Sequence, residues 1–145
     1  MKKIILVLLV CLLFTVGGCS AEKKSMPEQT IKNYFIAYND KNLPNLKSTL
    51  SEHFYNGDWH LNNIEYVKLL NLKELKDSNI EKGYLTNGRG KELKPAEVKV
   101  YEVEYDIKFK DVKKSVEGLN GKISKNFILI KQTKDSPWII SDMEL

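Results

Sequence analysis

The sequence predicts an α+β domain in which N-terminal helices pack on a curved antiparallel sheet. Shortly after residue 25, apolar residues recur at helical spacing, and from residue 97 they alternate with charged residues as in a half-buried strand. Helices that come first, followed by long strands, favour this class over an alternating parallel fold. We assign the single domain to residues 26–145.

The first helix is predicted to run from Pro27 to about Asp40. Ser25 and Glu28 have the spacing of a capping box, which would satisfy two backbone amides at the start of the helix. Pro27 falls in the first turn, where its missing N–H is not needed. The spacing i, i+3, i+4 and i+7 places four residues on one apolar face: Ile31, Tyr34, Phe35 and Tyr38.

A second, shorter helix is predicted from Asn42 to about Ser51, with Pro44 near its start. Residues 51–62 contain the turn sequence Asn56-Gly57-Asp58. A strand is expected over residues 64–75.

After a polar segment, residues 84–90 are expected to begin as a short strand and to stop at the glycine loop Gly88-Arg89-Gly90. Two further strands are expected over residues 126–133 and 138–142, joined by a turn that contains Pro137.

The segment from Glu97 to Lys110 has the clearest strand pattern. Val98 and Val100 have the opposite parity to the apolar residues that follow, which predicts a β-bulge near Val100. The residues expected to face the core are Tyr101, Val103, Tyr105, Ile107 and Phe109.

The beginning of the chain predicts export. Lys2 and Lys3 precede an apolar run, residues 4–16, that is shorter than the roughly 20 residues needed to cross a bilayer and is typical of a signal peptide. The run ends in Val16-Gly17-Gly18-Cys19, which resembles the lipobox of bacterial lipoproteins.

The lipobox resemblance implies that residues 1–18 are removed and that Cys19 carries a thioether-linked lipid. Residues 20–25 would form a polar tether that reaches about 20 Å when extended. The expected location is the cell membrane, lipid-anchored and facing outside the cytoplasm. Cys11 leaves with the leader, so no thiol would remain for a disulfide, a metal ligand or a nucleophile.

The composition excludes an obvious nucleic-acid footprint. The formal net charge is +4, and the basic residues are scattered among acidic ones rather than gathered in a stripe. We therefore expect no nucleic-acid partner. The abundance of Lys, Asn and Ile is typical of an AT-rich genome and, together with the lipobox, favours a Gram-positive source.

A family resemblance is carried by segments from most of the mature chain: Trp59, residues 63–72, Gly83-Tyr84-Leu85, Gly88-Arg89-Gly90, residues 98–109 and residues 136–143. Together they resemble an uncharacterised family of exported Gram-positive proteins, that of domain of unknown function 4829. That family is similar in fold to the nuclear transport factor two and cystatin-like superfamily, in which a curved sheet wraps around a helix to make a cone. Glu144 stands where the family pattern has a glycine. The resemblance implies a fold and a location but no activity.

Cones of this type bind small apolar molecules in other families, and some are isomerases or dehydratases. The resemblance therefore implies a cavity, which Tyr34, Tyr38 and Tyr105 are expected to line, although tyrosines on a core face also serve simply as packing groups. No Asp, Glu or His has a clear inward parity, so no catalytic residue is assigned.

Two other residues are candidate ligand contacts. Arg89 lies between glycines that would let backbone amides approach an anion, although the glycines also suit a turn with positive φ. Trp138 is either a core anchor for the last hairpin or a stacking surface. The histidines and acid at positions 53, 58 and 60 lack the three or four converging ligands of a zinc site, so we expect no metal and no cofactor.

We therefore expect a membrane-anchored extracytoplasmic lipoprotein that acts as a non-enzymatic binding module for a small molecule or an envelope protein. The alternative is a small-molecule enzyme of the isomerase or dehydratase type that uses the cavity. A buried Asp or His in the cavity would favour the enzyme, and an apolar, tyrosine-lined cavity would favour ligand binding. A filled cone with an exposed apolar patch would favour a protein partner.

Overall fold

The computed structural model describes residues 26–114 and 120–144. Short 3-10 turns lie at Glu52–Phe54, Leu61–Asn63 and Val112–Lys114. The helices and strands, in chain order, are α1 (Pro27–Asn39), α2 (Leu43–Ser48), β1 (Ile64–Glu74), α3 (Asn79–Thr86), α4 (Gly90–Leu93), β2 (Glu97–Phe109), β3 (Gly121–Lys131) and β4 (Ile139–Glu144).

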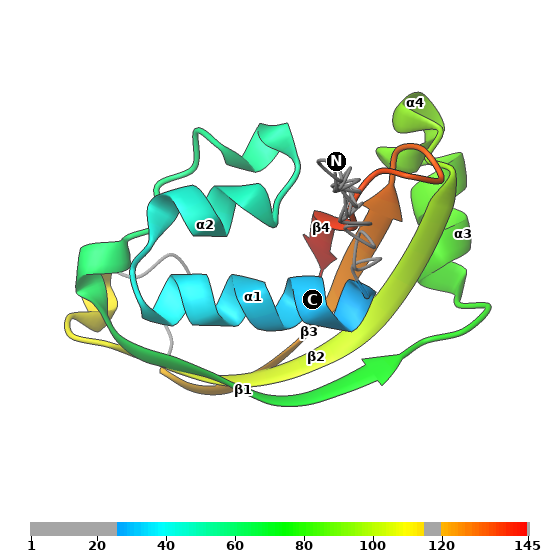
Figure 1. The fold of residues 1–145 in the computed structure, drawn as a ribbon. Helices are drawn as coiled ribbons and strands as arrows, with labels where there is room; N and C mark the ends of the chain where they lie inside the picture. Colours follow the sequence, from blue (N-terminus) through cyan, green and yellow to red (C-terminus); the bar gives the residue numbers. More distant parts are fainter. Residues whose placement is uncertain (1–25, 115–119, 145) are drawn as a thin grey trace, which may run out of the picture.

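The four strands form one antiparallel sheet in the order β1-β2-β3-β4. The sheet curves around α1, which lies along its concave side, while α2 packs on α1, and α3 and α4 lie at one end of the sheet (Figure 1). This arrangement confirms the predicted α+β class, with N-terminal helices on a curved antiparallel sheet.

The main core lies between α1 and the concave face of the sheet. Ile31, Phe35 and Phe127 are almost completely buried there. The Phe35 ring stacks on that of Phe127 at a centroid distance of 5.9 Å and meets that of Tyr105 at 5.2 Å. A large apolar side chain contributes roughly 1.5–3 kcal/mol when fully buried, so this aromatic face fixes α1 on the sheet.

The start of α1 differs from the capping box that the sequence predicts. Met26 is the N-cap and makes no side-chain cap bond, and Ser25 lies outside the described residues. Glu28 does not turn back to the backbone, because its Oε1 accepts a hydrogen bond of 2.7 Å from the Tyr101 hydroxyl. A tertiary bond to the sheet therefore replaces the local cap.

The second helix begins where predicted and ends early. The Asn42 side chain caps it by accepting a hydrogen bond from the Asn45 amide at 3.1 Å. Helix α2 then stops at Ser48, because the next residues pair with the sheet: Leu50 forms a parallel bridge with Ile140. These residues cover the outer edge of β4.

The prediction that alternate side chains from Tyr101 to Phe109 of β2 face the core is confirmed. The predicted bulge near Val100 is wrong. Strands β2 and β3 pair in one continuous register from Glu97 to Ile107. Val100 is buried on the opposite face of the sheet, in a second core with Tyr84, Ile128 and Ile130. Helices α3 and α4 cover that face locally, so apolar residues of both parities are buried without any bulge.

The expected short strand over residues 84–90 is also wrong, because most of this segment is helical. Ser78 caps α3 by accepting from the Glu81 amide at 3.1 Å. The helix turns Tyr84 inward, where its hydroxyl lies 2.7 Å from Ser141 Oγ. The Ser78-to-Glu81 spacing is that of a capping box and was the sequence signal for this helix.

Strand β1 matches its predicted position but contains two register irregularities, between Ile64 and Tyr66 and between Leu69 and Asn71. They interrupt the pairing of this edge strand with β2. The Val67 amide donates a hydrogen bond of 3.0 Å to the Asn39 side chain of α1.

Strand β3 begins at Gly121, five residues before the predicted Asn126. The extension adds Ile123 and Lys125 to the side of β3 that carries Phe127, because side chains alternate along a strand. The turn before β4 lies where the sequence places it.

The two glycines around Arg89 are needed for close packing rather than for positive φ. Gly121 is the one described glycine with positive φ. A Cβ on Gly90 would lie 2.5 Å from Cε1 of Tyr84, and one on Gly88 would lie 3.0 Å from the Tyr84 backbone. The Gly-Arg-Gly motif therefore lets the chain fold closely over Tyr84.

We expect Gly90→Ala to lower the free energy of unfolding by about 1–3 kcal/mol, because the added methyl overpacks the site. Gly83→Ala is the matched control: it lies within α3 and its Cβ would have no neighbour within 4 Å. That change should stabilise the protein by about 0.5–1 kcal/mol. Urea denaturation of both variants measures the difference, and equal effects would contradict the packing explanation.

Candidate functional site

An apolar cavity of about 290 Å³ lies between α1, the loop after α2 and the concave face of the sheet. It reaches the surface at Gly57 and Asp58, which are both exposed. Its wall is largely aromatic, formed by Tyr34, Tyr38, Phe54, Trp59, Tyr105 and Phe109. Ile107, Met143 and Lys125 complete the lining.

The three tyrosines expected to line a cavity do so together. Tyr34 and Tyr38 lie one turn apart on α1, and their ring centroids are 5.6 Å apart. Tyr105 comes from the inward-facing side of β2. Helical spacing on one element and strand alternation on the other therefore bring these residues to one space.

The loop between α2 and β1 closes the cavity with Trp59. The Trp59 ring meets the rings of Tyr38 and Phe54 at 6.1 Å each and that of Tyr34 at 6.5 Å. The Tyr38 hydroxyl donates to the Trp59 carbonyl at 3.5 Å. Aromatic edge contacts of this kind contribute roughly 0.5–1.5 kcal/mol beyond burial, so they hold the loop against α1.

The indole N–H of Trp59 is buried and has no hydrogen-bond partner among the described residues. Leaving a buried donor unsatisfied costs about 1–3 kcal/mol. The ring nitrogen lies beside Gly57, since a Cβ on that glycine would be 3.8 Å away. The cavity wall therefore contains a polar group whose hydrogen-bonding capacity is unused.

Two charged residues lie on the lining, and the sequence interpretation included neither as a ligand contact. Lys125 is half-buried on β3, and it was missed because the predicted strand began one residue later. Asp58 lies at the mouth, where its Oδ1 accepts from the His60 amide at 2.9 Å and its Oδ2 lies 3.3 Å from His60 Nδ1.

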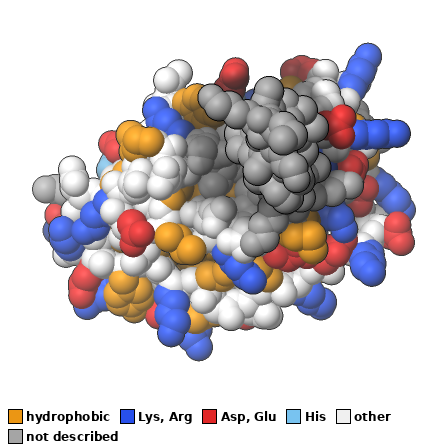
Figure 2. Space-filling model, viewed as in Figure 1, with side chains coloured by type: hydrophobic (Ala, Val, Ile, Leu, Met, Phe, Trp, Pro, Cys, Tyr) orange, Lys and Arg blue, Asp and Glu red, His pale blue; other side chains and the backbone are white. Residues whose placement is uncertain are grey.

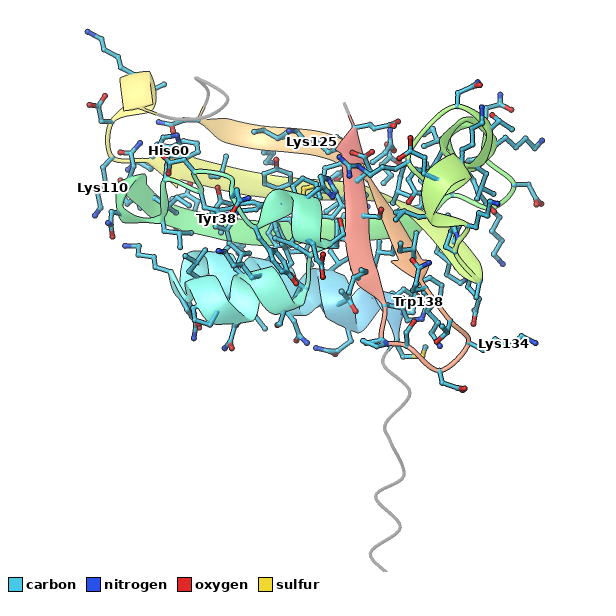
Figure 3. The ribbon with its side chains drawn as sticks, turned by 90° about the horizontal axis from the view of Figure 1, so that it is seen from above. Tyr38, His60, Lys110, Lys125, Lys134 and Trp138 are labelled. Atoms are coloured by element: carbon cyan, nitrogen blue, oxygen red, sulfur yellow. The ribbon has the colours of Figure 1, made fainter. Side chains whose placement is uncertain are left out.

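Trp138 and Arg89 lie outside the cavity lining. Trp138 is at the opposite end of the molecule from His60 and Lys110 (Figure 3). Its ring is buried and lies 5.6 Å from Lys131 Nζ, and its carbonyl accepts from the Thr30 hydroxyl at 3.3 Å. These contacts make Trp138 an anchor of the last hairpin, one of the two roles considered for it.

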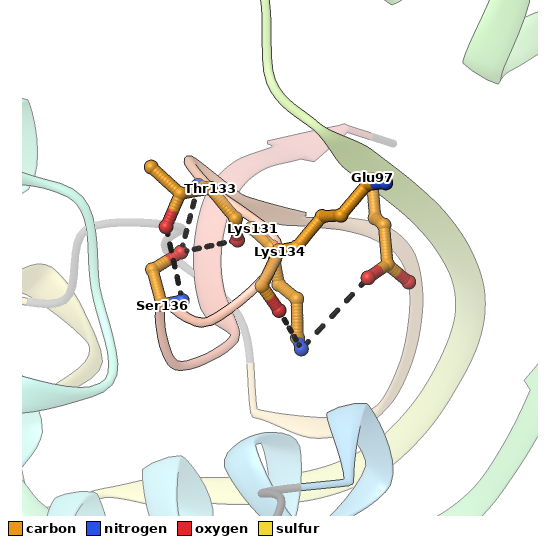
Figure 4. A network of polar contacts seen from close by, with 5 residues as sticks. All are labelled: Glu97, Lys131, Thr133, Lys134 and Ser136. Atoms are coloured by element: carbon orange, nitrogen blue, oxygen red, sulfur yellow. Dashed lines mark hydrogen bonds and ion pairs between the residues drawn. The ribbon is translucent and has the colours of Figure 1, made fainter.

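Lys131, the last residue of β3, is a buried charged residue in that hairpin. Its side chain is only 3% exposed, and its Nζ donates to the Lys134 carbonyl at 3.0 Å and lies 3.8 Å from Glu97 Oε1. Next to it, Thr133 and Ser136 exchange hydrogen bonds through their hydroxyls and amides (Figure 4). The turn is thus held by side chains as well as by the backbone.

Arg89 is exposed at the start of α4 and affects a neighbouring histidine. The pKa of His53 is lowered from its usual value, first by partial burial and then by the positive charge of Arg89, while Asp142 opposes both. His53 Nδ1 also lies 2.7 Å from Ser51 Oγ. Because the folded state disfavours the protonated ring, this site destabilises the fold as the pH falls below about 6.5.

Metal binding has no candidate cluster in the described residues: nowhere in 26–114 or 120–144 do three His, Cys, Asp or Glu side chains gather around one point. His53 bonds to Ser51, whereas His60 pairs with Asp58. In the same two segments, no helix is long and apolar enough to span a bilayer.

The family model for Domain of unknown function (DUF4829) matches residues 28–143, a range that contains the whole cavity lining. This match confirms the resemblance to that uncharacterised domain. No curated protein and no solved structure matches the chain significantly. The likeness to the nuclear transport factor two and cystatin-like superfamily therefore stays a prediction.

We expect Arg89→Gln to raise the pKa of His53 towards its ordinary value, because the change removes a nearby positive charge. NMR titration of the His53 ring measures the shift. Lys91→Gln on the same helix removes an equal charge from an exposed position that does not contribute to the His53 shift, and it serves as the control. An unchanged pKa in the Arg89 variant would contradict the proximity of the two groups.

Proposed function

The chain belongs to the family of the domain of unknown function DUF4829, and since membership brings no activity, we propose a function from the leader and the cavity. The protein is a membrane-anchored extracytoplasmic lipoprotein that binds a small, largely apolar molecule without chemical conversion. The observation that carries the binding proposal is the aromatic cavity of about 290 Å³. Ligand sites are typically concave and mostly apolar with a few polar groups, and this volume is at their small end.

The anchoring proposal rests on the lipobox and on the short distance between it and the fold. Helix α1 begins at Pro27, so residues 20–26 separate Cys19 from the first helix. Such a segment extends over at most about 25 Å, which would hold the domain close to the lipid surface.

A small-molecule enzyme is the second candidate, and Asp58 at the cavity mouth is the residue that favours it. An acid or base that works in such a cavity is normally tuned by apolar surroundings. The Asp58 side chain is 76% exposed and is already bonded to His60. The lining therefore supports binding better than proton transfer.

A protein partner is the third candidate, and it would need a continuous apolar patch. On the face shown in Figure 2, charged side chains of both signs are spread over the described surface, and hydrophobic ones form small separate groups. This face offers less support for a protein partner than the cavity does for a small ligand.

We expect Cys19→Ala to release the protein from the membrane fraction, because the variant lacks the sulfur to which the lipid would be attached. Fractionation of cells followed by immunoblotting measures the distribution. A Ser20→Ala variant changes the neighbouring residue, keeps the sulfur and should stay in the membrane. Equal anchoring of the Cys19 variant would overturn the lipoprotein assignment.

Binding is tested with 1-octanol, a neutral amphiphile, by isothermal titration calorimetry. All described elements lie at or after Pro27, so the chain from residue 19 with Cys19→Ala retains them and is used without lipid. Ile107→Phe extends a buried lining side chain into the cavity and should weaken octanol binding at least severalfold with little loss of stability. Leu85→Phe, on exposed α3 surface, should leave binding unchanged.

The proposal is contradicted if the chain from residue 19 with Cys19→Ala does not bind octanol and if adding Ile107→Phe lowers its stability, as overpacking of a filled core would. The cavity would then not be a ligand site.

A further inference from the structure

The cavity wall contains one donor whose position is set by packing alone. The indole N–H of Trp59 is buried and has no hydrogen-bond partner among the described residues. Ring contacts with Tyr38 and Phe54, at centroid distances of 6.1 Å each, fix the plane of the indole. A buried donor without an acceptor is costly, so an acceptor that reached this N–H would gain affinity.

This donor lies beside the opening of the cavity. A Cβ on Gly57 would be 3.8 Å from the Trp59 ring nitrogen, and Gly57 is an exposed lining residue at the mouth. Because glycine has no side chain, only the backbone of residue 57 stands next to the N–H. The Gly57 amide donates to the Phe54 carbonyl at 3.1 Å, which closes a short turn. A small shift of this turn is therefore enough to open the donor to the cavity.

Other polar groups of the wall are engaged by the protein itself. The Asp58 carboxylate is bonded to the amide of His60 at 2.9 Å and lies 3.3 Å from its ring nitrogen. The Tyr38 hydroxyl donates to the Trp59 carbonyl at 3.5 Å. Lys125 also takes part in an interaction within the protein. The described wall thus presents an unused donor rather than an unused charge, which favours a neutral ligand.

We propose that the cavity binds a neutral apolar molecule with a carbonyl group, a ketone or an ester, whose oxygen accepts a hydrogen bond from the Trp59 indole. This inference rests on the proposed binding function and adds the chemical class of the ligand. The apolar part of the molecule lies among the aromatic rings of the wall. A carbonyl oxygen only accepts, whereas a hydroxyl group also brings an O–H that needs a partner of its own in the apolar cavity.

The test compares acetophenone with α-methylstyrene, a probe of the same shape in which a methylene group replaces the carbonyl oxygen. Each is titrated by NMR into the ¹⁵N-labelled chain from residue 19 with Cys19→Ala. The sequence has two tryptophans, so the indole region contains two signals, which Trp138→Phe assigns. We expect acetophenone to move the Trp59 indole proton downfield of its position with α-methylstyrene, because this N–H gains a hydrogen bond.

The variant Trp59→Phe removes the donor and keeps an aromatic ring in the wall. It should weaken acetophenone binding about fivefold relative to α-methylstyrene binding, the net value of one hydrogen bond. Comparing the two probes in both chains removes the effects of the smaller ring and of the different hydration of the probes. Trp138→Phe makes the same change at the other end of the molecule (Figure 3) and should leave the ratio of the two affinities unchanged.

The outcomes separate the two proposals. If both probes bind but leave the Trp59 indole proton at the same position, the carbonyl inference is wrong while the cavity remains a ligand site. The same conclusion follows if Trp59→Phe weakens the binding of both probes by one factor. If Trp59→Phe does not fold, the position of the indole proton in the chain that retains Trp59 decides. If neither probe binds and octanol does not bind either, the proposed function itself fails.

Discussion

The structure depends on the packing of one aromatic helix face inside a curved sheet. Phe35 of α1 lies against Phe127 and Tyr105, while Tyr34 meets Phe127 edge-on at 5.6 Å. Burying this face orients α1 along the concave side of the sheet. The orientation of α1 in turn determines where the loop between α2 and β1 can pack against it. The sheet is held by its ladders, but the space between the sheet and α1 is set by the size of these rings.

The cavity follows from the same packing. Tyr34 and Tyr105, which contact Phe127 and Phe35 in the core, also line the space where α1, the loop and β2 converge. Trp59 closes this space from the loop side through contacts with Tyr34 and Tyr38. One set of side chains therefore stabilises the domain and forms the wall of the cavity, so a substitution in the wall changes the stability as well as the shape of the cavity.

The sequence predicted the fold class well where a single periodicity governs burial. The helical face of α1 and the alternation from Tyr101 to Phe109 were both confirmed, because each segment contacts one core. Prediction failed where a second core forms on the other face. Val98 and Val100 looked like a bulge, because no local pattern reveals that α3 covers the far side of β2. Tyr84 was assigned to a strand because the capping-box spacing of Ser78 and Glu81 was not used.

Of the candidate site, the sequence located the three tyrosines and missed their charged neighbour. Tyr34, Tyr38 and Tyr105 line the cavity, whereas Arg89 and Trp138 do not. Lys125 lies on the same side of β3 as Ile123 and Phe127, and this can be read from the sequence once the strand is known to begin at Gly121. Asp58 and Trp59 belong to an irregular loop, whose path depends on tertiary contacts and cannot be read from periodicity.

Both edge strands of the sheet have features that disfavour pairing with another copy of the domain. An exposed edge strand presents unpaired backbone N–H and C=O groups with which a strand of another molecule can pair, and such pairing can start aggregation. On one side, residues 49–51 lie along β4, and on the other, Asn39 occupies an amide of β1 while two irregularities break its regular spacing. A second copy of the domain would therefore meet irregular, partly covered edges instead of a regular row of unpaired backbone groups.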